Sequence, residues 1–399
     1  MFCITAVSQK FLMSSKNAIT IGSLVEKDLK EAYFLPQKPS SYGKGYRFLN
    51  DKKYRVFDYP PCSLSFRRIM SPFRHLPAVG NEIPVIMECT PESYLQQHWK
   101  QWLPAFPPVV IKTLDEGLQD DVPVVTTGAF QGIPKHKHSV DPDIIYEVQL
   151  KSSILDIKAP MPRHMDEDVI SYPCMVKVDM SAGGMGNRLV KNEGELSAIL
   201  RQVRDVCGWK GKAVFQEIFP GIKEVPSCHF HLHKSGEIFW IGTDIAGFNG
   251  YSFTSGTVDW DKQEEYEHLL YEEFTIPIKE YLQERGYFGL VNFEVLITDH
   301  GNYLVDVNPR IGGDTTHVLL ARYLALDFGL KHSKIFFFNK HCTTAKKLVE
   351  KANGINQNGN GIVIVLSAAD VDKGCESFLS VFAKTPEMVQ SLFHRVMND

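Results

Sequence analysis

The sequence predicts an α/β protein of the mixed (α+β) kind. From residue 83 onward, apolar runs of strand length alternate with amphipathic runs of helix length, a pattern typical of sheets covered by helices. Several strand-like runs also follow one another across short turns, which predicts antiparallel hairpins. Apolar residues make up 44% and charged residues 23% of the chain, so a disordered chain is excluded.

The length of 399 residues predicts two or three domains. We expect an N-terminal α/β domain at 1–150, whose first 80 residues predict only irregular structure, and a second domain at 151–399. The 43 basic and 47 acidic residues give a net charge of −4, which offers no general attraction for nucleic acid or an anionic membrane. No apolar run reaches the roughly 18 residues that a membrane span needs.

The cysteines and the N-terminal segment bear on the compartment. The 8 cysteines are widely spaced and form no CxxC pair, which favours reduced, mostly buried thiols. Residues 1–16 lack the charged start and long apolar core of a secretory signal. We therefore expect a cytoplasmic protein, with a transit peptide as the minor alternative.

Each element is expected from its local pattern. The helix at 193–206 places Leu196, Ile199 and Leu200 on one face, and the helix at 263–285 ends before Gly286. In the first domain, strands are predicted at 84–89, 108–111 and 122–127, with a helix at 91–103. In the second domain, strands are predicted at 174–178, 189–190, 213–219 and 361–366, hairpins at 225–241 and 290–308, and further helices at 315–330 and 387–396.

A lysine and a glycine-rich loop form the first motif. Lys177 lies near the end of a predicted strand, and Gly183, Gly184 and Gly186 follow within nine residues. Backbone without side chains can approach a polyphosphate closely, and successive N–H groups bind anions. The segment is neither a Walker A loop nor a Rossmann fingerprint. A solvated hairpin loop is the structural alternative.

Two carboxylates on a predicted hairpin form the second motif. Glu294 and Asp306 lie on its two arms, and strand alternation places Asn308 on the same face as Asp306. Three oxygen ligands on adjacent strands suit Mg²⁺, with Mn²⁺ as an alternative. Arg310 follows at the strand end, where its planar guanidinium could bind a phosphate or a carboxylate. The alternative is a hairpin with a polar, solvent-facing side.

These residues resemble the ATP-grasp superfamily of ligases, over roughly 151–330. The segment YPCMVK followed by SAGGMG is similar to the family's second ATP lysine and phosphate-binding loop, and VFQEIFPGIKE to its hinge. VNFEVLITDHGNYLVDVNPRIGGD resembles its metal-binding hairpin. The resemblance implies an ATP-grasp fold with an N-terminal α/β domain, a small lid subdomain at about 160–215 and a C-terminal metal-binding subdomain.

The resemblance also implies a role for each matched residue. Lys151 and Lys177 would contact the nucleotide phosphates, and the three glycines would cap them. Glu217 and Phe219 would line the adenine pocket, and Glu224 would bind the ribose hydroxyls.

In the metal-binding hairpin, the resemblance implies that Glu294, Asp306 and Asn308 hold Mg²⁺. Arg310 would face the γ-phosphate and the acyl intermediate, with Gly313 and Asp314 beside the substrate. The family usually has glutamate at the position of Asp306. The shorter aspartate would hold the metal closer to its strand or through water.

Three other segments have simpler interpretations. His229, His231 and His233 alternate along one strand, and a spacing of about 6.6 Å per pair is too wide for all three to bind one ion, so we expect a polar face beside the nucleotide. Residues 135–138 predict a solvated loop, with a phosphate-binding patch as the alternative. Residues 251–256 predict a polar loop that could contact substrate.

Asn-Pro-Arg followed by Gly-Gly-Asp is most similar to the ligases that join carboxylates to amines, including amino acids. The expected reaction forms an acyl phosphate from ATP and a carboxylate, which an amine then attacks, releasing ADP and phosphate. The substrates would be small molecules. The sequence does not indicate the oligomeric state, and the resemblance allows a homodimer, since dimers are common in similar enzymes. Phosphoryl transfer to a small hydroxylated metabolite and a non-catalytic nucleotide-binding module are the alternatives.

Overall fold

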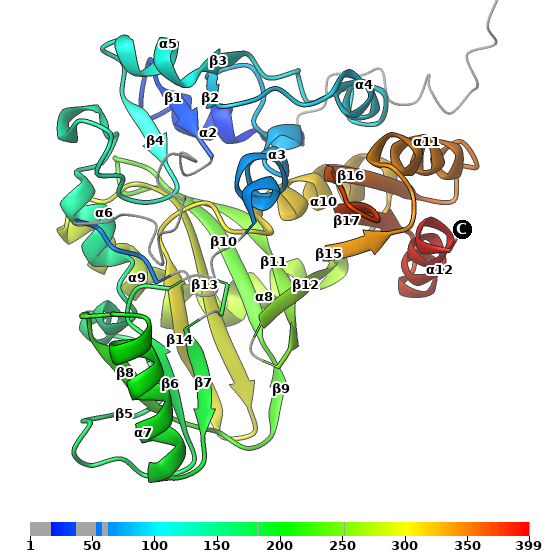
Figure 1. Ribbon diagram of the computed structural model, residues 1–399. Coiled ribbons are helices and arrows are strands. Elements are labelled where there is room, and N and C mark those ends of the chain that lie inside the picture. Colours follow the sequence, from blue (N-terminus) through cyan, green and yellow to red (C-terminus); the bar gives the residue numbers. More distant parts are fainter. Residues whose placement is uncertain are drawn as a thin grey trace, which may run out of the picture.

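Three sheets organise the structure, a computed structural model that describes residues 17–36, 53–57, 63–181, 183–184, 186–250 and 252–398 (Figure 1). The N-terminal segment 1–16, on which the expected lack of a signal depends, lies outside the described residues. Within the described part of the chain, no helix is long and apolar enough to cross a membrane, and the cysteines are free thiols. The predicted mixed α/β class is confirmed.

The N-terminal sheet is parallel, with the strand order β3-β2-β1-β4. The sequence did not predict its central strand β1, which has only three buried residues. The strand expected at 108–111 begins later, because Pro107 and Pro108 lack the N–H that a ladder needs. The elements of this part are α2 (Ile21–Glu26), β1 (Tyr33–Leu35), α3 (Ser71–Phe73), β2 (Val85–Met87), α4 (Ser93–Trp102), β3 (Ile111–Thr113), α5 (Leu114–Gln119), β4 (Val124–Thr126) and α6 (Pro142–Val148).

A small antiparallel sheet in the order β5-β8-β6-β7 projects from the lower part of the molecule (Figure 1). The predicted helix at 193–206 is an α-helix that passes into one π-helical turn at Gln202–Val206. Val176, Leu196 and Phe215 pack together in a hydrophobic core between this sheet and its helix. Its elements are β5 (His164–Met165), β6 (Cys174–Val178), β7 (Asn187–Val190), α7 (Glu193–Arg201) and β8 (Ala213–Glu217).

The largest sheet has nine strands in the order β14-β13-β10-β11-β12-β15-β17-β16, with β9 also paired to β13. Both predicted hairpins are present, as β10–β11 and β13–β14. The polar loop expected at 251–256 is instead the start of β12, and Tyr251 lies outside the described residues. The strands here are β9 (Ile222–Glu224), β10 (Pro226–Leu232), β11 (Ile238–Asn249), β12 (Ser252–Asp259), β13 (Gly289–Thr298) and β14 (Gly301–Asn308).

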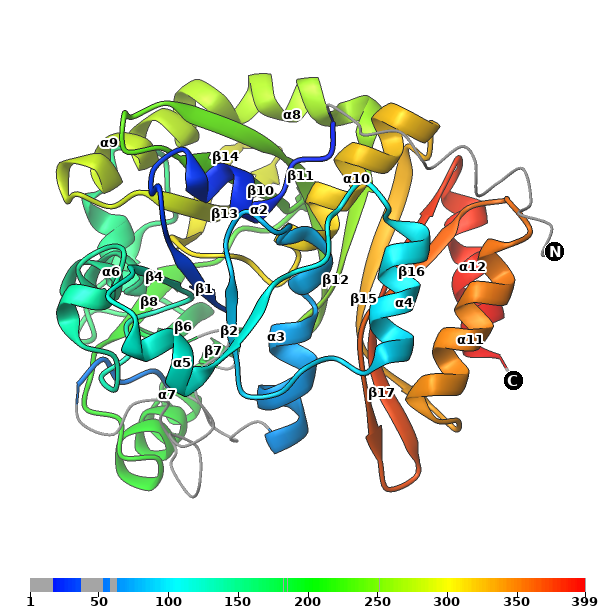
Figure 2. The same ribbon diagram turned by 90° about the horizontal axis from the view of Figure 1, so that it is seen from above.

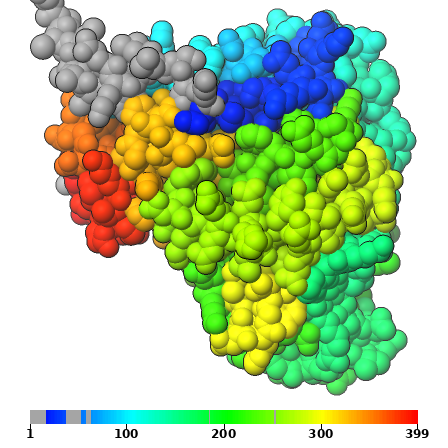
Figure 3. All heavy atoms as spheres, turned by 180° about the vertical axis from the view of Figure 1, so that it is seen from behind, coloured from blue at the N-terminus to red at the C-terminus, as the bar shows by residue number. Residues whose placement is uncertain are grey.

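Helices cover the back of this sheet. The helix expected at 263–285 is a helical segment made of α8 (Gln263–Leu270), a π-helical turn at Tyr271–Thr275, and α9 (Ile276–Glu284). Pro277 lies at the start of α9, directly after the π-helical turn, where the hydrogen-bond pattern of the helix changes. Figure 3 shows the yellow-green atoms of this region over the rear face, with the small sheet projecting below.

The C-terminal region contains more structure than the sequence predicted. Beyond α10 (Thr315–Phe328), the strand expected at 361–366 and the helix expected at 387–396 are present. Three further elements, β15, α11 and β17, were not predicted. Figure 2 shows α4 of the N-terminal part beside α11, and Trp99 Nε1 donates to the Val365 carbonyl at 2.8 Å. One hydrophobic core therefore spans both ends of the chain. The added elements are β15 (His332–His341), α11 (Ala345–Asn356), β16 (Ile362–Val371), β17 (Gly374–Ala383) and α12 (Pro386–Met397).

Candidate active site

A cavity of about 440 Å³ lies where the three sheets meet, and it is lined by residues of the two antiparallel sheets and by residues that follow strands of the N-terminal sheet. The carboxyl ends of parallel strands point to it, since Pro36 follows β1 and Thr127 follows β4. In open parallel sheets, ligands bind at these ends. Of the residues predicted for the site, the cavity is lined by Lys151, Gly183, Gly184, Glu294, Asp306, Asn308, Arg310, Gly313 and Asp314.

The β13–β14 hairpin places the predicted metal ligands together. Glu294 is the cross-strand partner of Asp306, and Asn308 lies two residues further along β14. Asn308 Nδ2 donates to Asp306 Oδ2 at 3.2 Å. Burial, together with the neighbouring Asp306, raises the pKa of Glu294 to about 7. Two carboxylates and an amide oxygen on adjacent strands are a donor set that fits a hard divalent cation.

Two lysines bring positive charge to the same hairpin. The Lys151 ammonium forms an ion pair with the Asp306 carboxylate at the cavity wall. Lys177 Nζ donates to the Val305 carbonyl at 2.8 Å, and Lys177 itself does not line the cavity. Burial lowers the pKa of Lys177 to about 8, although Asp306 opposes that shift. Lys151 contacts the Asp306 side chain, and Lys177 contacts the backbone of the residue before it. Both cations therefore lie beside the two carboxylates.

Arg310 and the segment after it continue this wall. Arg310 Nη2 donates to Asn308 Oδ1 at 2.9 Å, and Nη1 donates to the Ile311 carbonyl at 3.2 Å. The guanidinium is therefore positioned from both sides. We name the cavity surface formed by Lys151, Glu294, Asp306, Asn308 and Arg310 the charged wall.

The glycine-rich loop joins β6 to β7 above the charged wall. Gly183 and Gly184 have φ values of +62° and +75°, a conformation that favours glycine, and both line the cavity. Gly186 is required for a different reason, because a Cβ there would lie 2.6 Å from Ser181 Oγ. The loop residues 182 and 185 lie outside the described part of the chain.

The residues expected to hold adenine and ribose lie outside the cavity. The Arg163 backbone N–H donates to Glu217 Oε1 at 2.7 Å, and Tyr266 Oη donates to Glu224 Oε2 at 2.7 Å. The Phe219 ring stacks on Tyr303 of β14, with centroids 4.1 Å apart. The structure thus gathers the predicted phosphate and metal residues and leaves this group apart, along the junction of β8, β9 and β14.

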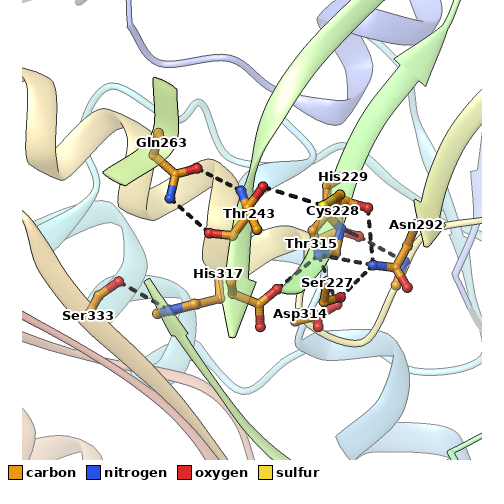
Figure 4. Close-up of polar contacts among 12 residues, drawn as sticks. Ser227, Cys228, His229, Thr243, Gln263, Asn292, Asp314, Thr315, His317 and Ser333 are labelled. Carbon is orange, nitrogen blue, oxygen red and sulfur yellow. Dashed lines mark hydrogen bonds and ion pairs between the residues drawn. The ribbon is translucent and has the colours of Figure 1, made fainter. Parts of the chain in front are cut away.

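A buried cluster at the edge of the cavity was not predicted as a unit (Figure 4). His229 Nε2 lies 3.2 Å from Asp244 Oδ1, 3.5 Å from Asp314 Oδ1 and 3.2 Å from Asn292 Nδ2. Asp244 is fully buried, and its Oδ2 has no hydrogen-bond partner among the described residues. Gly256 leaves the room for this carboxylate, since a Cβ there would lie 1.8 Å from Asp244 Oδ2.

The charges of this cluster are coupled. Burial and the nearby Asp314 raise the pKa of Asp244 to about 7. Burial alone would lower the pKa of His229, but Asp314 and Asp244 outweigh burial and raise it. The two carboxylates therefore favour the protonated form of His229, and Asp314 extends this network to the cavity surface.

The other two histidines of the stripe have a different partner. His231 Nε2 and His233 Nδ1 lie 2.8 Å and 3.0 Å from Asp28 Oδ2, between β10 and the N-terminal part. The prediction that His231 and His233 belong to a polar face beside the nucleotide is therefore wrong, because both side chains contact Asp28 instead. At 135–138, Lys135 and His136 are exposed, as a solvated loop predicts, whereas Lys137 is buried and donates to the Asp120 carbonyl at 2.9 Å.

Sequence reasoning also missed several cavity-lining residues. Arg74 and Phe66 come from the part that predicted only irregular structure, and Phe337 and Phe338 from the unpredicted strand β15. The apolar run at 335–338 was the signal that could have revealed β15.

Comparisons with known proteins identify the fold. Residues 148–314 match the family model of an ATP-grasp domain, which confirms the resemblance. The N5-carboxyaminoimidazole synthetase of Staphylococcus aureus, solved with ADP, is 12% identical with a TM-score of 0.53, over 92% of this chain and 98% of that chain. The L-amino acid ligase of Bacillus licheniformis is 11% identical with a TM-score of 0.51, over 92% of this chain and 97% of that chain. A search of curated protein sequences finds no match. At these identities the structural likeness shows the fold.

Proposed function

Because the chain carries an ATP-grasp domain at 148–314, we propose that it is an ATP-dependent ligase that joins a carboxylate to an amine. ATP would phosphorylate the carboxylate, and the amine would displace phosphate from the acyl phosphate. The observation that carries the proposal is the charged wall, where two carboxylates, an amide oxygen, a lysine and an arginine line one cavity.

In this proposal Glu294, Asp306 and Asn308 hold Mg²⁺ or Mn²⁺. The ion, when bound, neutralises phosphate charge and orients the transferring phosphoryl group. Lys151 is paired with Asp306, one of the proposed metal ligands. Its ammonium group therefore lies beside the proposed metal site. Lys151 and Lys177 bind phosphate oxygens, and the backbone of Gly183, Gly184 and Gly186 closes over them.

Arg310 acts on the transferring group. Its guanidinium is fixed by Asn308 and by the Ile311 carbonyl, so it adds positive charge without rearranging, as transition-state stabilisation requires. The carboxylate substrate lies near Gly313 and Asp314.

The remaining assignments concern the base and the domains. We assign Glu217 and Phe219 to adenine and Glu224 to the ribose, along the junction of β8 and β9. We also propose that 151–399 is the ATP-grasp domain with a lid at about 160–215, and that 1–150 completes the substrate side of the cavity.

The test is an ADP-release screen of the purified chain with Mg-ATP against paired carboxylates and amines, repeated with hydroxylamine. A carboxylate substrate yields a hydroxamate, whereas a hydroxyl acceptor yields none. ADP release without hydroxamate from any carboxylate would favour the phosphotransferase alternative and contradict the proposal.

A further inference from the structure

Phenylalanine rings form a second surface of the cavity, which we name the aromatic wall: Phe66, Phe248, Phe253, Phe337 and Phe338. The rings contact one another, since Phe66 stacks on Phe338 with centroids 5.6 Å apart, and Phe253 meets Phe337 edge-on at 5.2 Å. Phe338 and Phe248 are nevertheless 54% and 43% exposed. Large apolar side chains left exposed around a cavity mark a binding surface for an apolar group.

The backbone of β15 is distorted in a way that builds this wall. Phe338 has a φ of +56°, and the pairing of β15 with β17 shifts register between Phe336 and Asn339. In a regular strand, Phe337 and Phe338 would point to opposite faces, whereas both line the cavity here. A non-glycine residue in this conformation costs on the order of 1–3 kcal/mol, and such strain gathers at functional sites.

A guanidinium lies between the two walls. Arg74 packs over the rings of Phe337 and Phe378, at 5.9 Å and 5.6 Å from their centroids. Its Nε donates to His75 Nε2 at 3.2 Å, which fixes its direction. A Cβ on Gly313 would lie 3.7 Å from Arg74 Nη2 and 3.6 Å from Phe337, so the segment after Arg310 borders both.

Arg74 forms no direct ion pair with a carboxylate of the described residues, and the nearby Asp314 is shared with His229. Burial lowers the pKa of Arg74 to about 10, the nearby Asp314 carboxylate opposes that shift, and the positive charge of Arg310 adds to it. Two guanidinium groups at one cavity, with the nearby carboxylate shared with His229, favour an anionic ligand between them.

We propose that the cavity binds a carboxylate that carries an aromatic or bulky apolar group, with the carboxylate between Arg74 and Arg310 and the apolar group against the aromatic wall. The inference rests on the proposed function and names its acyl substrate class. Small or strongly polar acids would leave the phenylalanines exposed and gain little from them.

The test compares 3-phenylpropionate with propionate, and phenylalanine with alanine, by calorimetric binding to the full chain. Each acid is titrated with and without Mg²⁺ and a non-hydrolysable ATP analogue, so that acid binding and nucleotide binding are scored separately. The phenyl acids should bind at least about tenfold more tightly than their small counterparts.

Two variants and two matched controls locate the effect. Arg74→Lys should weaken 3-phenylpropionate about tenfold, because lysine lacks the planar fork, and Phe338→Ala should do the same. Arg322→Lys is the control for the first, since Arg322 also packs over aromatic rings but does not line the cavity. Leu326→Ala is the control for the second, as Leu326 is 47% exposed and outside the cavity.

The outcomes separate this inference from the function it rests on. Equal affinity for the phenyl and small acids, or competition of the phenyl acid with the ATP analogue, would overturn the inference even if ADP is released. Absence of nucleotide binding would contradict the ligase proposal, while the acid affinities would still decide whether the aromatic wall selects its ligand.

Discussion

The two walls of the cavity differ in how their side chains are paired. On the charged wall, Lys151 pairs with Asp306 and Arg310 with Asn308, so four of its five groups have a partner of suitable charge or polarity, and Glu294 lies beside them. On the aromatic wall, Phe338 is exposed and strained, and Arg74 at its edge forms no direct ion pair among the described residues, since the nearby Asp314 contacts His229. Most groups of the charged wall are thus paired with one another. The aromatic wall instead offers a surface for a group that the protein itself does not supply. In our proposals the charged wall carries the reaction and the aromatic wall selects the substrate.

The largest expected effect comes from the charged wall. Glu294→Gln removes one proposed metal ligand but keeps the shape of the side chain, so ADP formation should fall to background while the melting temperature stays near that of the wild type. ADP release and thermal unfolding, measured on the same sample, check this. Near-normal turnover at saturating Mg²⁺ would show that Glu294 does not hold the ion.

Arg310→Lys should have the next largest effect. Loss of one transition-state donor commonly costs about 10²–10³ in kcat, and the fixed guanidinium fork has no lysine equivalent. We expect near-normal binding of Mg-ATP with most turnover lost, and Arg322→Lys as an unaffected control. If Arg310 only stabilises the fold, the variant would instead melt earlier and its folded fraction would be fully active.

A third prediction concerns the scaffold that carries both walls. His98 of α4 is buried, contacts Asn353 at 2.6 Å and accepts a hydrogen bond from the Val365 N–H at 3.0 Å. Burial lowers its pKa to about 4. The unfolded chain therefore takes up a proton first as the pH falls, and the free energy of unfolding should decrease between about pH 6.5 and pH 4, by up to about 1.4 kcal/mol per pH unit.

The check on His98 is the difference in unfolding free energy between the wild type and His98→Gln, followed by urea titration across that pH range. The difference should shrink toward low pH, because the variant lacks the titrating group. A constant difference would mean that His98 carries the same charge in the folded and unfolded chain.

The smallest expected effect tests the strain on the aromatic wall. Alanine is normally more stable than glycine within a strand, but at a φ of +56° the order should reverse. Phe338→Gly should therefore be more stable than Phe338→Ala by about 1 kcal/mol. Chemical denaturation of the two variants measures it, and the usual order would show that Phe338 is unstrained.

The same contrast explains what the sequence could predict. Most of the charged wall lies within one hairpin and its exit, 294–310, where strand alternation alone places Asp306 and Asn308 together. The aromatic wall and Arg74 come from the helical turn before α3, the end of α3, and strands β11, β12 and β15, which tertiary packing brings together. The contact between His229 and Asp244 was missed for another reason, because Asp244 lies on β11 beyond residue 241, where the predicted hairpin ends.

Local patterns therefore predicted the elements better than their partners. The β13–β14 hairpin and the β6 strand were found within one or two residues, since each has a clear apolar run and turn. The three-residue strand β1 has too little sequence to show a period, and Trp99 gave no sign that α4 docks on β16 at the other end of the chain.

The central claim is that the charged wall activates a carboxylate. Incubation of the purified chain with Mg-ATP, hydroxylamine and 3-phenylpropionate or phenylalanine tests it most directly. The account predicts a hydroxamate in amounts equal to the ADP released, and neither product from Glu294→Gln. ADP without hydroxamate, or hydroxamate that persists at the wild-type level in Glu294→Gln, would contradict it.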